Sequence, residues 1–280
     1  MSRTDRTSRN RPSDEGIGTT SDLSVVEAAL RALRSGAPDD LTPRTLVEVG
    51  LADSWDLVDT PAGLVVVAWN GRGVAVVDLA GDHDAMERRH LATTGRPLAP
   101  ASPLPSPWRR AIERRLAGDR RARVPLDLRG RTTFERSVWE KALEIPAGEV
   151  RPYGWVAAEI GHPRAVRAVG SALGHNPVPL VVPCHRVVRS DGSIGEYSLG
   201  GASVKRRLLT AEGVDLDELE ILTRRGIRYV GSATTRIYCL PTCRHARRIA
   251  AANRVPFRTT HEGETAGYRA CRDCRPRAAA

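Results

Sequence analysis

The sequence lacks the features that mark membrane-spanning and secreted proteins. No run of apolar residues approaches the roughly 18 that a membrane-spanning helix needs. The first residues contain no basic segment followed by an apolar stretch, which a secretion signal requires. The five cysteines are an odd number, and 280 residues can bury a core without disulfides. We therefore expect a cytoplasmic protein, with no membrane partner, whose thiols serve chemistry or metal binding.

Acidic residues are scarce in one part of the sequence, its last fifth. Residues 224–280 contain 13 arginines and 3 acidic residues, whereas residues 1–223 contain 30 basic and 30 acidic residues. The whole net charge of +10 therefore comes from the carboxyl-terminal segment. The planar guanidinium group of arginine suits phosphate, which favours a polyanionic partner. The alternative is a solvated basic surface that serves solubility.

Local patterns predict a disordered tail at residues 1–22 and an α+β domain at residues 23–128. The tail is rich in Ser, Thr, Arg and Asp and has little to bury. Residues 64–69 and 74–79 are apolar and β-branched, and Asn70-Gly71 between them predicts a hairpin turn. Two helices are expected between residues 23 and 51, separated at Ser35-Gly36-Ala37-Pro38. Two more helices are expected at residues 84–93 and 108–117.

A helical domain is expected next, at residues 129–222. Thr132 and Glu135 have the spacing of a capping box at the start of a helix. Arg164 and Arg167 lie three residues apart and should share one face of a later helix. Two later helices are expected at residues 155–160 and 164–173. The three-residue turn between them is typical of a helix-turn-helix.

Cys184 and His185 are adjacent in an apolar, proline-rich segment. A thiol attacks as its thiolate, and the reference pKa of cysteine is about 8.5, so a reactive cysteine needs a base or a positive neighbour. His185 can supply that base. The alternative for an isolated pair is an inert buried cysteine, because free cysteine behaves as a small hydrophobic residue.

A series of motifs surrounds this pair from Gly148 to Gly213. They are Gly148-Glu149-Val150, Pro152-Tyr153-Gly154, Ala165-Val166-Arg167-Ala168-Val169-Gly170, Asn176-Pro177-Val178-Pro179, Pro183-Cys184-His185-Arg186-Val187 and Gly195-Glu196-Tyr197-Ser198, followed by Lys205, Leu208-Leu209 and Glu212-Gly213. With these motifs the segment closely resembles the O6-alkylguanine-DNA alkyltransferase family. Glu196 is a departure, because that position in the family often holds a small or amide residue.

The resemblance implies single-turnover transfer of an alkyl group from the O6 atom of guanine in double-stranded DNA to Cys184. It implies that His185 takes the thiol proton through water and that Glu212 orients the imidazole. Asn176 resembles the amide that ties the helix-turn-helix to the cysteine segment. The product is a thioether, a poor leaving group, so each molecule reacts once.

The resemblance also implies a set of DNA contacts, because guanine O6 can be reached only after the nucleotide leaves the base stack. Arg167 would take the vacated space, and Tyr153 would crowd the phosphate of the rotated nucleotide. The alternatives are a solvated arginine and a core tyrosine. The other expected contacts are Arg164, on the helix face of Arg167, and Tyr197 and Ser198, which would hold the leaving guanine.

The remaining cysteines form two pairs, Cys239 with Cys243 and Cys271 with Cys274, separated by 27 residues. This paired spacing predicts a tetrahedral zinc site of four thiolates rather than disulfides. The segments 234–244 and 266–276 resemble the zinc-binding domain of the Ada proteins, which we expect at residues 223–280. The resemblance implies that Cys239 is a second methyl acceptor, for DNA phosphotriesters. A purely structural zinc module that anchors DNA by its arginines is the alternative.

Together these features predict an α+β protein, a monomer, that repairs alkylated double-stranded DNA by direct reversal and needs zinc but no organic cofactor. A rival from another class is a DNA-binding methylation sensor that regulates transcription. A preference for one DNA sequence would favour the rival, whereas sequence-indifferent binding with irreversible thiol alkylation would favour repair.

Overall fold

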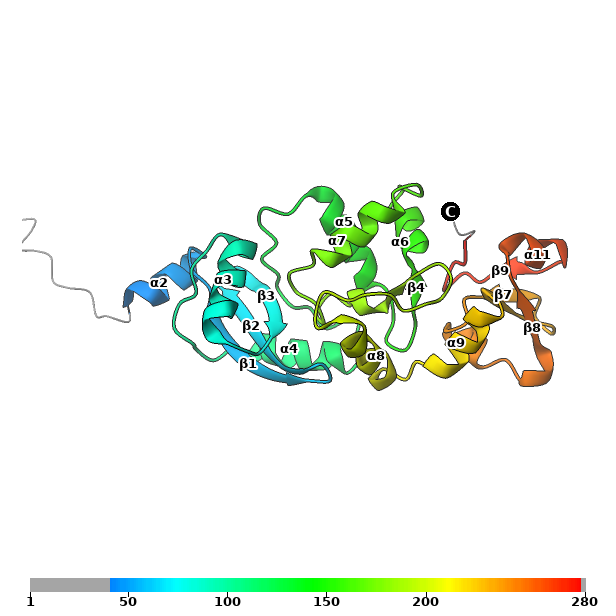
Figure 1. The fold of residues 1–280 in the computed structure, drawn as a ribbon, viewed down its shortest axis with the longest axis horizontal. Coiled ribbons are helices and arrows are strands. Elements are labelled where there is room, and N and C mark those ends of the chain that lie inside the picture. Colours follow the sequence, from blue (N-terminus) through cyan, green and yellow to red (C-terminus); the bar gives the residue numbers. More distant parts are fainter. Residues whose placement is uncertain (1–40, 278–280) are drawn as a thin grey trace, which may run out of the picture. The chain divides into compact units, whose positions relative to one another are not determined.

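The computed structural model describes residues 41–277 (Figure 1), and the chain from Pro43 onward forms one compact unit. The predicted tail and the first predicted helix lie outside the described residues. The second predicted helix is confirmed as α2 (Leu41–Val49). The division into domains at 1–22, 23–128, 129–222 and 223–280 stays a prediction.

An antiparallel sheet of order β1-β2-β3 confirms the predicted hairpin and adds a strand to it. The strands are β1 (Ser54–Thr60), β2 (Gly63–Asn70) and β3 (Gly73–Leu79). Asn70 pairs with Gly73 across the turn, and a Cβ atom on Gly71 would lie 2.0 Å from the Glu48 carbonyl oxygen of α2. Gly71 therefore permits close approach of the helix backbone as well as the turn. We did not predict β1, whose apolar pattern is interrupted by Asp56; that carboxylate is bound by the Leu104 amide and Arg109.

Two helices that follow the sheet confirm the prediction at residues 84–93 and 108–117. They are α3 (His83–Thr94) and α4 (Ser106–Leu116). Asp82 caps α3 by accepting a hydrogen bond from the Ala85 amide, and Gly95 ends it in a left-handed conformation. Arg115 of α4 is buried and donates to the carbonyls of Val181 and Leu143, which ties this part of the chain to the cysteine segment.

The helices α5, α6 and α7 pack together around Trp139, Val156 and Val169, which are buried (Figure 1). The predicted capping box is present, because Thr132 Oγ1 accepts from the Glu135 amide while the Glu135 carboxylate accepts from the Thr132 amide. The bounds of these helices are α5 (Thr133–Leu143), α6 (Tyr153–Glu159) and α7 (Val166–Gly174).

The turn between α6 and α7 is longer than the three residues predicted, and the predicted place of Arg164 is wrong. The Ala165 amide bonds to the His162 carbonyl at 2.9 Å and closes a turn that contains Arg164, so α7 begins only at Val166. Pro163, a residue that suits the first turn of a helix, therefore lies in the turn before α7. Arg164 precedes the helix and does not share a helical face with Arg167.

A short parallel pair of strands brings α6 beside the cysteine segment. Arg151 pairs with Val187 and Pro152 with Val188, so Tyr153, the first residue of α6, follows directly on the pairing. The elements involved are β4 (Arg151–Pro152), the 3-10 helix η1 (Cys184–Arg186) and β5 (Val187–Val188), followed by α8 (Gly201–Ala211) and α9 (Leu216–Arg224).

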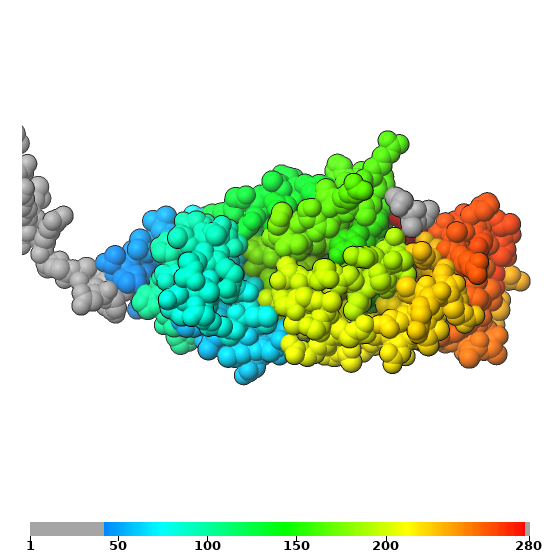
Figure 2. Space-filling model, in the orientation of Figure 1, coloured from blue at the N-terminus to red at the C-terminus, as the bar shows by residue number. Residues whose placement is uncertain are grey.

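The carboxyl-terminal part is built on a four-stranded sheet of order β8-β6-β7-β9. Its strands are β6 (Tyr229–Ser232), β7 (Ile237–Cys239), β8 (Arg254–Phe257) and β9 (Arg269–Ala270), with α10 (Arg244–Arg247), η2 (Ala251–Asn253) and α11 (Thr260–Thr265) between them. Figure 2 shows the orange surface of this part beside the yellow surface of α9. The Arg254 guanidinium of β8 pairs with the Glu218 carboxylate of α9. With its separate sheets and helices the fold is α+β, as predicted. No helix within residues 41–277 is long and apolar enough to cross a membrane.

Candidate functional site

Cys184 is a buried thiol held by Asn176, which lies just beyond the end of α7. The Asn176 amide nitrogen lies 3.1 Å from Cys184 Sγ and donates to the Val182 carbonyl at 3.2 Å. Its side-chain oxygen accepts from the Val178 amide at 3.1 Å. One side chain therefore contacts both the loop after the helix and the sulfur.

His185, which directly follows Cys184 and is buried, pairs with the half-buried Glu212. His185 Nε2 lies 2.8 Å from the Glu212 carboxylate, and the other ring nitrogen, Nδ1, is buried with no hydrogen-bond partner among the described residues. Burial lowers the pKa of His185, although the hydrogen bond to Glu212 opposes this. Burial alone would raise the pKa of Glu212, but hydrogen bonds from His185 and Arg186 lower it to about 2. The arrangement at neutral pH is therefore a neutral imidazole bonded to a carboxylate, with Nδ1 able to accept a proton.

Lys205 is a buried cation near the thiol, and we assigned it no role from the sequence. Its Nζ donates to the Val187 carbonyl at 2.7 Å, and burial lowers its pKa to about 8 against the opposing charge of Cys184. Burial raises the pKa of Cys184, while the Asn176 hydrogen bond and the charge of Lys205 act in the other direction. The sequence held one signal, because Lys205 is one of only two lysines in a chain with 41 arginines.

Two of the residues expected to contact DNA, Tyr153 and Tyr197, lie near the thiol, and a third, Ser198, lies at the surface. The Tyr197 ring lies 6.0 Å from the His185 ring, and burial followed by the proximity of Cys184 raises the Tyr197 pKa well above its usual value. Burial, with a further contribution from Cys184, also raises the pKa of Tyr153, which is half-buried at the start of α6. Ser198 is exposed.

The structure does not bring Arg164 or Arg167 into contact with the residues around Cys184. Both arginines are exposed, and neither forms a salt bridge within residues 41–277. Arg167 lies in the first turn of α7, where its side chain can meet a ligand outside the protein. Glu196 is also exposed, so its charge lies at the surface rather than inside the thiol site.

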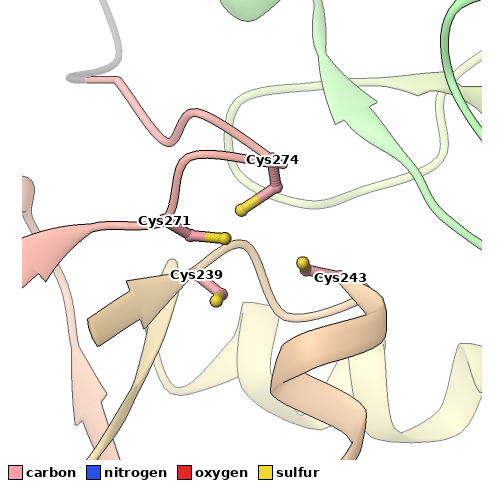
Figure 3. Close-up of side chains that lie close together, drawn as sticks. All are labelled: Cys239, Cys243, Cys271 and Cys274. Atoms are coloured by element: carbon pink, nitrogen blue, oxygen red, sulfur yellow. The ribbon is translucent and has the colours of Figure 1, made fainter. Parts of the chain in front are cut away.

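The four remaining cysteines come together at one buried point (Figure 3). Cys239 ends β7, Cys243 precedes α10, and Cys271 and Cys274 lie in the turn after β9. Their sulfur atoms all lie within 4.8 Å of one another. A tetrahedral Zn–S distance of ~2.3 Å requires sulfurs about 3.8 Å apart, so the donors fit a zinc ion. The Leu240 amide donates to Cys274 Sγ at 3.4 Å, an outer hydrogen bond typical of metal thiolates.

The two pairs of cysteines differ in their access to the surface. Cys239 and Cys271 line an open cavity of about 520 Å³, whereas Cys243 and Cys274 have no exposed surface. Among the exposed residues around the cavity are Thr235 and three arginines, Arg248, Arg269 and Arg272, with one acidic residue, Asp273. The cavity therefore joins two of the four sulfurs to a basic surface.

A buried thiol beside a histidine–carboxylate pair, a helix-turn-helix and a separate four-cysteine centre define a DNA-binding protein with cysteine chemistry. Residues 133–214 match the family described as 6-O-methylguanine DNA methyltransferase, DNA binding domain, and residues 223–277 match the metal binding domain of Ada. A methylated-DNA–protein-cysteine methyltransferase of Mycolicibacterium paratuberculosis is 40% identical over 159 residues, which cover 55% of this chain and 89% of that protein. The chain belongs to the methylated-DNA–protein-cysteine methyltransferase family.

Two further curated relatives are similar over smaller parts of their length. The methyltransferase of Mycobacterium tuberculosis is 53% identical over 89 residues, 32% of this chain and 53% of that protein, so the chain spans about half of its length. The bifunctional transcriptional activator/DNA repair enzyme Ada of Escherichia coli is 37% identical over 166 residues, 58% of this chain and 46% of that protein. A solved structure of M. tuberculosis OGT in complex with DNA is 33% identical, with 61% of this chain and 98% of that chain covered and a TM-score of 0.46.

Proposed function

We propose that this protein repairs double-stranded DNA by moving an alkyl group from the O6 atom of guanine to Cys184, once per molecule. The observation that supports the proposal best is one buried thiol, bonded to the Asn176 amide, followed directly in the chain by a histidine that pairs with Glu212. This is the combination of nucleophile, base and orienting carboxylate that activates a weak nucleophile.

The proposed reaction begins with a protonated thiol, because burial raises the pKa of Cys184. Neutral His185 takes the thiol proton through water, and Glu212 balances the charge of the imidazolium. A bond forms between Cys184 Sγ and the alkyl carbon while the bond from that carbon to O6 breaks. The electron pair leaves with guanine, which takes up one proton in place of the one that the thiol lost. The cation of Lys205 favours the thiolate during the attack.

The number of alkyl groups removed per protein molecule tests this proposal. The product is a thioether, which holds its alkyl group, so repair should stop when the amount of guanine restored equals the amount of protein. Continued repair beyond that amount would show a true catalyst and overturn the proposal.

Arg167 is proposed to occupy the space that the rotated nucleotide leaves in the base stack. Arg167→Ala should therefore slow repair of duplex DNA far more than reaction with free O6-benzylguanine, because only the duplex requires extrusion, at a cost of about a few kcal/mol. Single-turnover rates with the two substrates measure the difference. Arg164→Ala is the matched variant; it removes an exposed charge outside the helix and should weaken duplex binding, most at low salt, without this selectivity. Equal slowing by Arg167→Ala on both substrates would assign Arg167 to the chemistry or the fold instead.

We further propose that the four cysteines hold zinc and that Cys239 is a second methyl acceptor, for DNA phosphotriesters. Zinc, when bound, keeps the sulfurs deprotonated at neutral pH. Cys239 lies in the open cavity, and the exposed Thr235 and arginines there can contact a phosphate. In the reaction the Cys239 sulfur bonds to the methyl carbon, the carbon–oxygen bond of the triester breaks, and the phosphate leaves as a diester anion.

The acceptor can be identified in a protein that lacks the first site. The zinc-loaded Cys184→Ser variant, incubated with DNA that carries methylphosphotriesters, should gain one CH₂ unit on the peptide containing Cys239. Cys271 lines the same cavity and is the internal control; Cys243 and Cys274 have no exposed surface and should stay unmodified. If Cys239 stays unmodified while zinc remains bound, the segment is a structural DNA anchor.

The methylation sensor remains the alternative function, and the similarity to an activator that is also a repair enzyme is the observation that favours it. Methylation of Cys239 removes one negative charge from the cysteine centre, which should raise affinity for DNA through the surrounding arginines. If the gain is confined to one DNA sequence, the sensor is supported. A gain that is the same for all sequences supports repair alone.

A further inference from the structure

The segment that carries Tyr153, residues 149–159, is held at several points by the loops that carry the four cysteines. The first point is Val150, just before β4. Its amide donates to Thr242 Oγ1 at 2.9 Å, and the same hydroxyl donates back to the Val150 carbonyl at 3.3 Å. Thr242 lies between Cys239 and Cys243 and is buried, so this contact joins the first cysteine loop to the residue before β4, which leads into α6.

The second point is Trp155 in α6. Its indole nitrogen donates to the backbone carbonyl of Cys274 at 2.9 Å, and both groups are buried. The Arg275 guanidinium lies over the indole ring at 5.5 Å from its centre, within the range of a cation–π contact. Trp155 is therefore bonded to one of the four cysteine residues and stacked against its neighbour.

The third point is Glu159, the last residue of α6. Its side chain is only 3% exposed, and its carboxylate pairs with Arg275 at 2.7 Å and Arg277 at 3.1 Å. Lys141 lies farther away, at 3.9 Å. A buried carboxylate is costly without close cations, so Glu159 depends on two arginines of the carboxyl-terminal segment. Arg275 also adopts φ of 45°, a left-handed conformation that is unfavourable outside glycine and persists only where the surroundings impose it.

We propose that the four-cysteine centre positions the first helix of the helix-turn-helix, through Trp155 and Glu159, for DNA capture. These two are positioning residues, because their bonds are to the Cys274 carbonyl and to arginine side chains rather than to a reacting sulfur. The loops around a metal site of this kind are ordered by the metal itself, so loss of zinc would release the Cys274 carbonyl and the Arg275 side chain together. Tyr153 lies between the contacts at Val150 and Trp155, and β4 pairs with β5 shortly after Cys184.

The inference uses the proposed zinc site but goes beyond the proposed alkyl transfer, since it links two parts of the chain that could act separately. Its consequence is specific. Zinc removal should impair the reaction that needs the helix-turn-helix, which is repair of duplex DNA. It should spare the reaction that needs only the thiol site, which is alkylation by free O6-benzylguanine.

The test compares the full-length protein with and without zinc by amide hydrogen exchange and by the two reaction rates. Zinc removal should speed exchange in α6 by about tenfold or more, the factor that loss of one hydrogen bond can produce, and leave the sheet β1-β2-β3 unchanged. The rate of duplex repair should fall by a similar factor. The rate with O6-benzylguanine should stay within about threefold of its value with zinc bound, a smaller change than the loss of one hydrogen bond produces.

Two variants separate this coupling from direct DNA binding by the zinc segment. Trp155→Phe keeps a ring for Arg275 but removes the donor to Cys274, and Glu159→Gln removes the charge that pairs with the arginines. The double variant should still bind one zinc ion per molecule, repair duplex DNA slowly, and exchange its α6 amides rapidly whether or not zinc is present. Glu140→Gln, the same change on an exposed glutamate of α5 with no salt bridge in the described chain, should behave as the unaltered protein.

The outcomes divide clearly. Exchange in α6 that does not respond to zinc, or a double variant that responds as strongly as the unaltered protein, would overturn the coupling even if Cys184 is alkylated normally. Failure of Cys184 to react with either substrate would overturn the proposed alkyl transfer, and the exchange measurement would still decide the coupling.

Discussion

Replacing Cys184 with serine is expected to abolish alkyl transfer from O6-methylguanine while leaving binding to the damaged duplex close to that of the unaltered protein. A serine hydroxyl is a far weaker nucleophile than a thiol at neutral pH. The smaller oxygen can keep a hydrogen bond from the Asn176 amide, so the buried segment should fold as before. Equilibrium binding and single-turnover repair, measured on the same preparation, check both parts.

The control for this variant is its zinc-binding segment, which the substitution does not contact. The Cys184→Ser protein should bind zinc and unfold at nearly the same temperature as the unaltered protein. Restoration of guanine by a folded Cys184→Ser protein would mean that another group accepts the alkyl group.

Replacing His185 or Glu212 with glutamine is expected to reduce the rate of transfer. For His185→Gln the reduction should be about 10²–10⁴-fold, the usual contribution of a general base. The effect of Glu212→Gln should be smaller, since the imidazole remains. Burial raises the pKa of the Cys184 thiol, so without a proton acceptor little thiolate is available. Single-turnover rates at saturating duplex DNA measure the loss. Glu220→Gln, an exposed glutamate that pairs with Arg206 on the surface, is the matched control.

The pH profile distinguishes a base from a merely structural residue. Burial lowers the pKa of His185, so the imidazole should stay able to accept a proton to a lower pH than free histidine. Glu212 works against that shift. In Glu212→Gln the His185 pKa should fall further, and the acid limb of the rate profile should move to lower pH while the plateau rate decreases. A limb that stays in place, or one that moves to higher pH, would contradict the assignment of His185 as the base.

Elements that depend on local sequence were predicted well. The hairpin at Asn70-Gly71 and the capping box at Thr132 and Glu135 each satisfy backbone groups within a few residues, so their signals are complete in the sequence. We placed the start of α7 too early, because Pro163 also suits the first turn of a helix. In the structure, the His162–Ala165 hydrogen bond closes a turn there instead. That error removed Arg164 from the face of Arg167.

Elements that depend on distant partners were not predicted. Strand β1 contains Asp56, whose carboxylate accepts hydrogen bonds from the Leu104 amide and the Arg109 side chain. Both residues lie far from Asp56 in the sequence. The buried position of Lys205 and the contacts of Trp155 with Cys274 are likewise set by packing between remote segments. No periodicity or short motif reports such contacts.

The candidate site divides in the same way. The spacing of Cys239, Cys243, Cys271 and Cys274 was sufficient to predict that their sulfur atoms lie close together, and the structure confirms it. The pairing of His185 with Glu212, 27 residues apart, was expected only because the segment resembles a known family. Their roles in transfer, and those of Asn176, Tyr153, Arg164, Arg167, Tyr197 and Ser198, remain proposals that the variants above address.

The central claim is that Cys184 itself keeps the alkyl group, and mass spectrometry of the protein after reaction tests it most directly. The intact protein, exposed to excess duplex DNA that contains O6-methylguanine and no phosphotriester, should gain one CH₂ unit. Peptide mapping should place that unit on Cys184, with the amount of modified protein equal to the amount of guanine restored. Restored guanine with an unmodified Cys184 peptide would contradict the account.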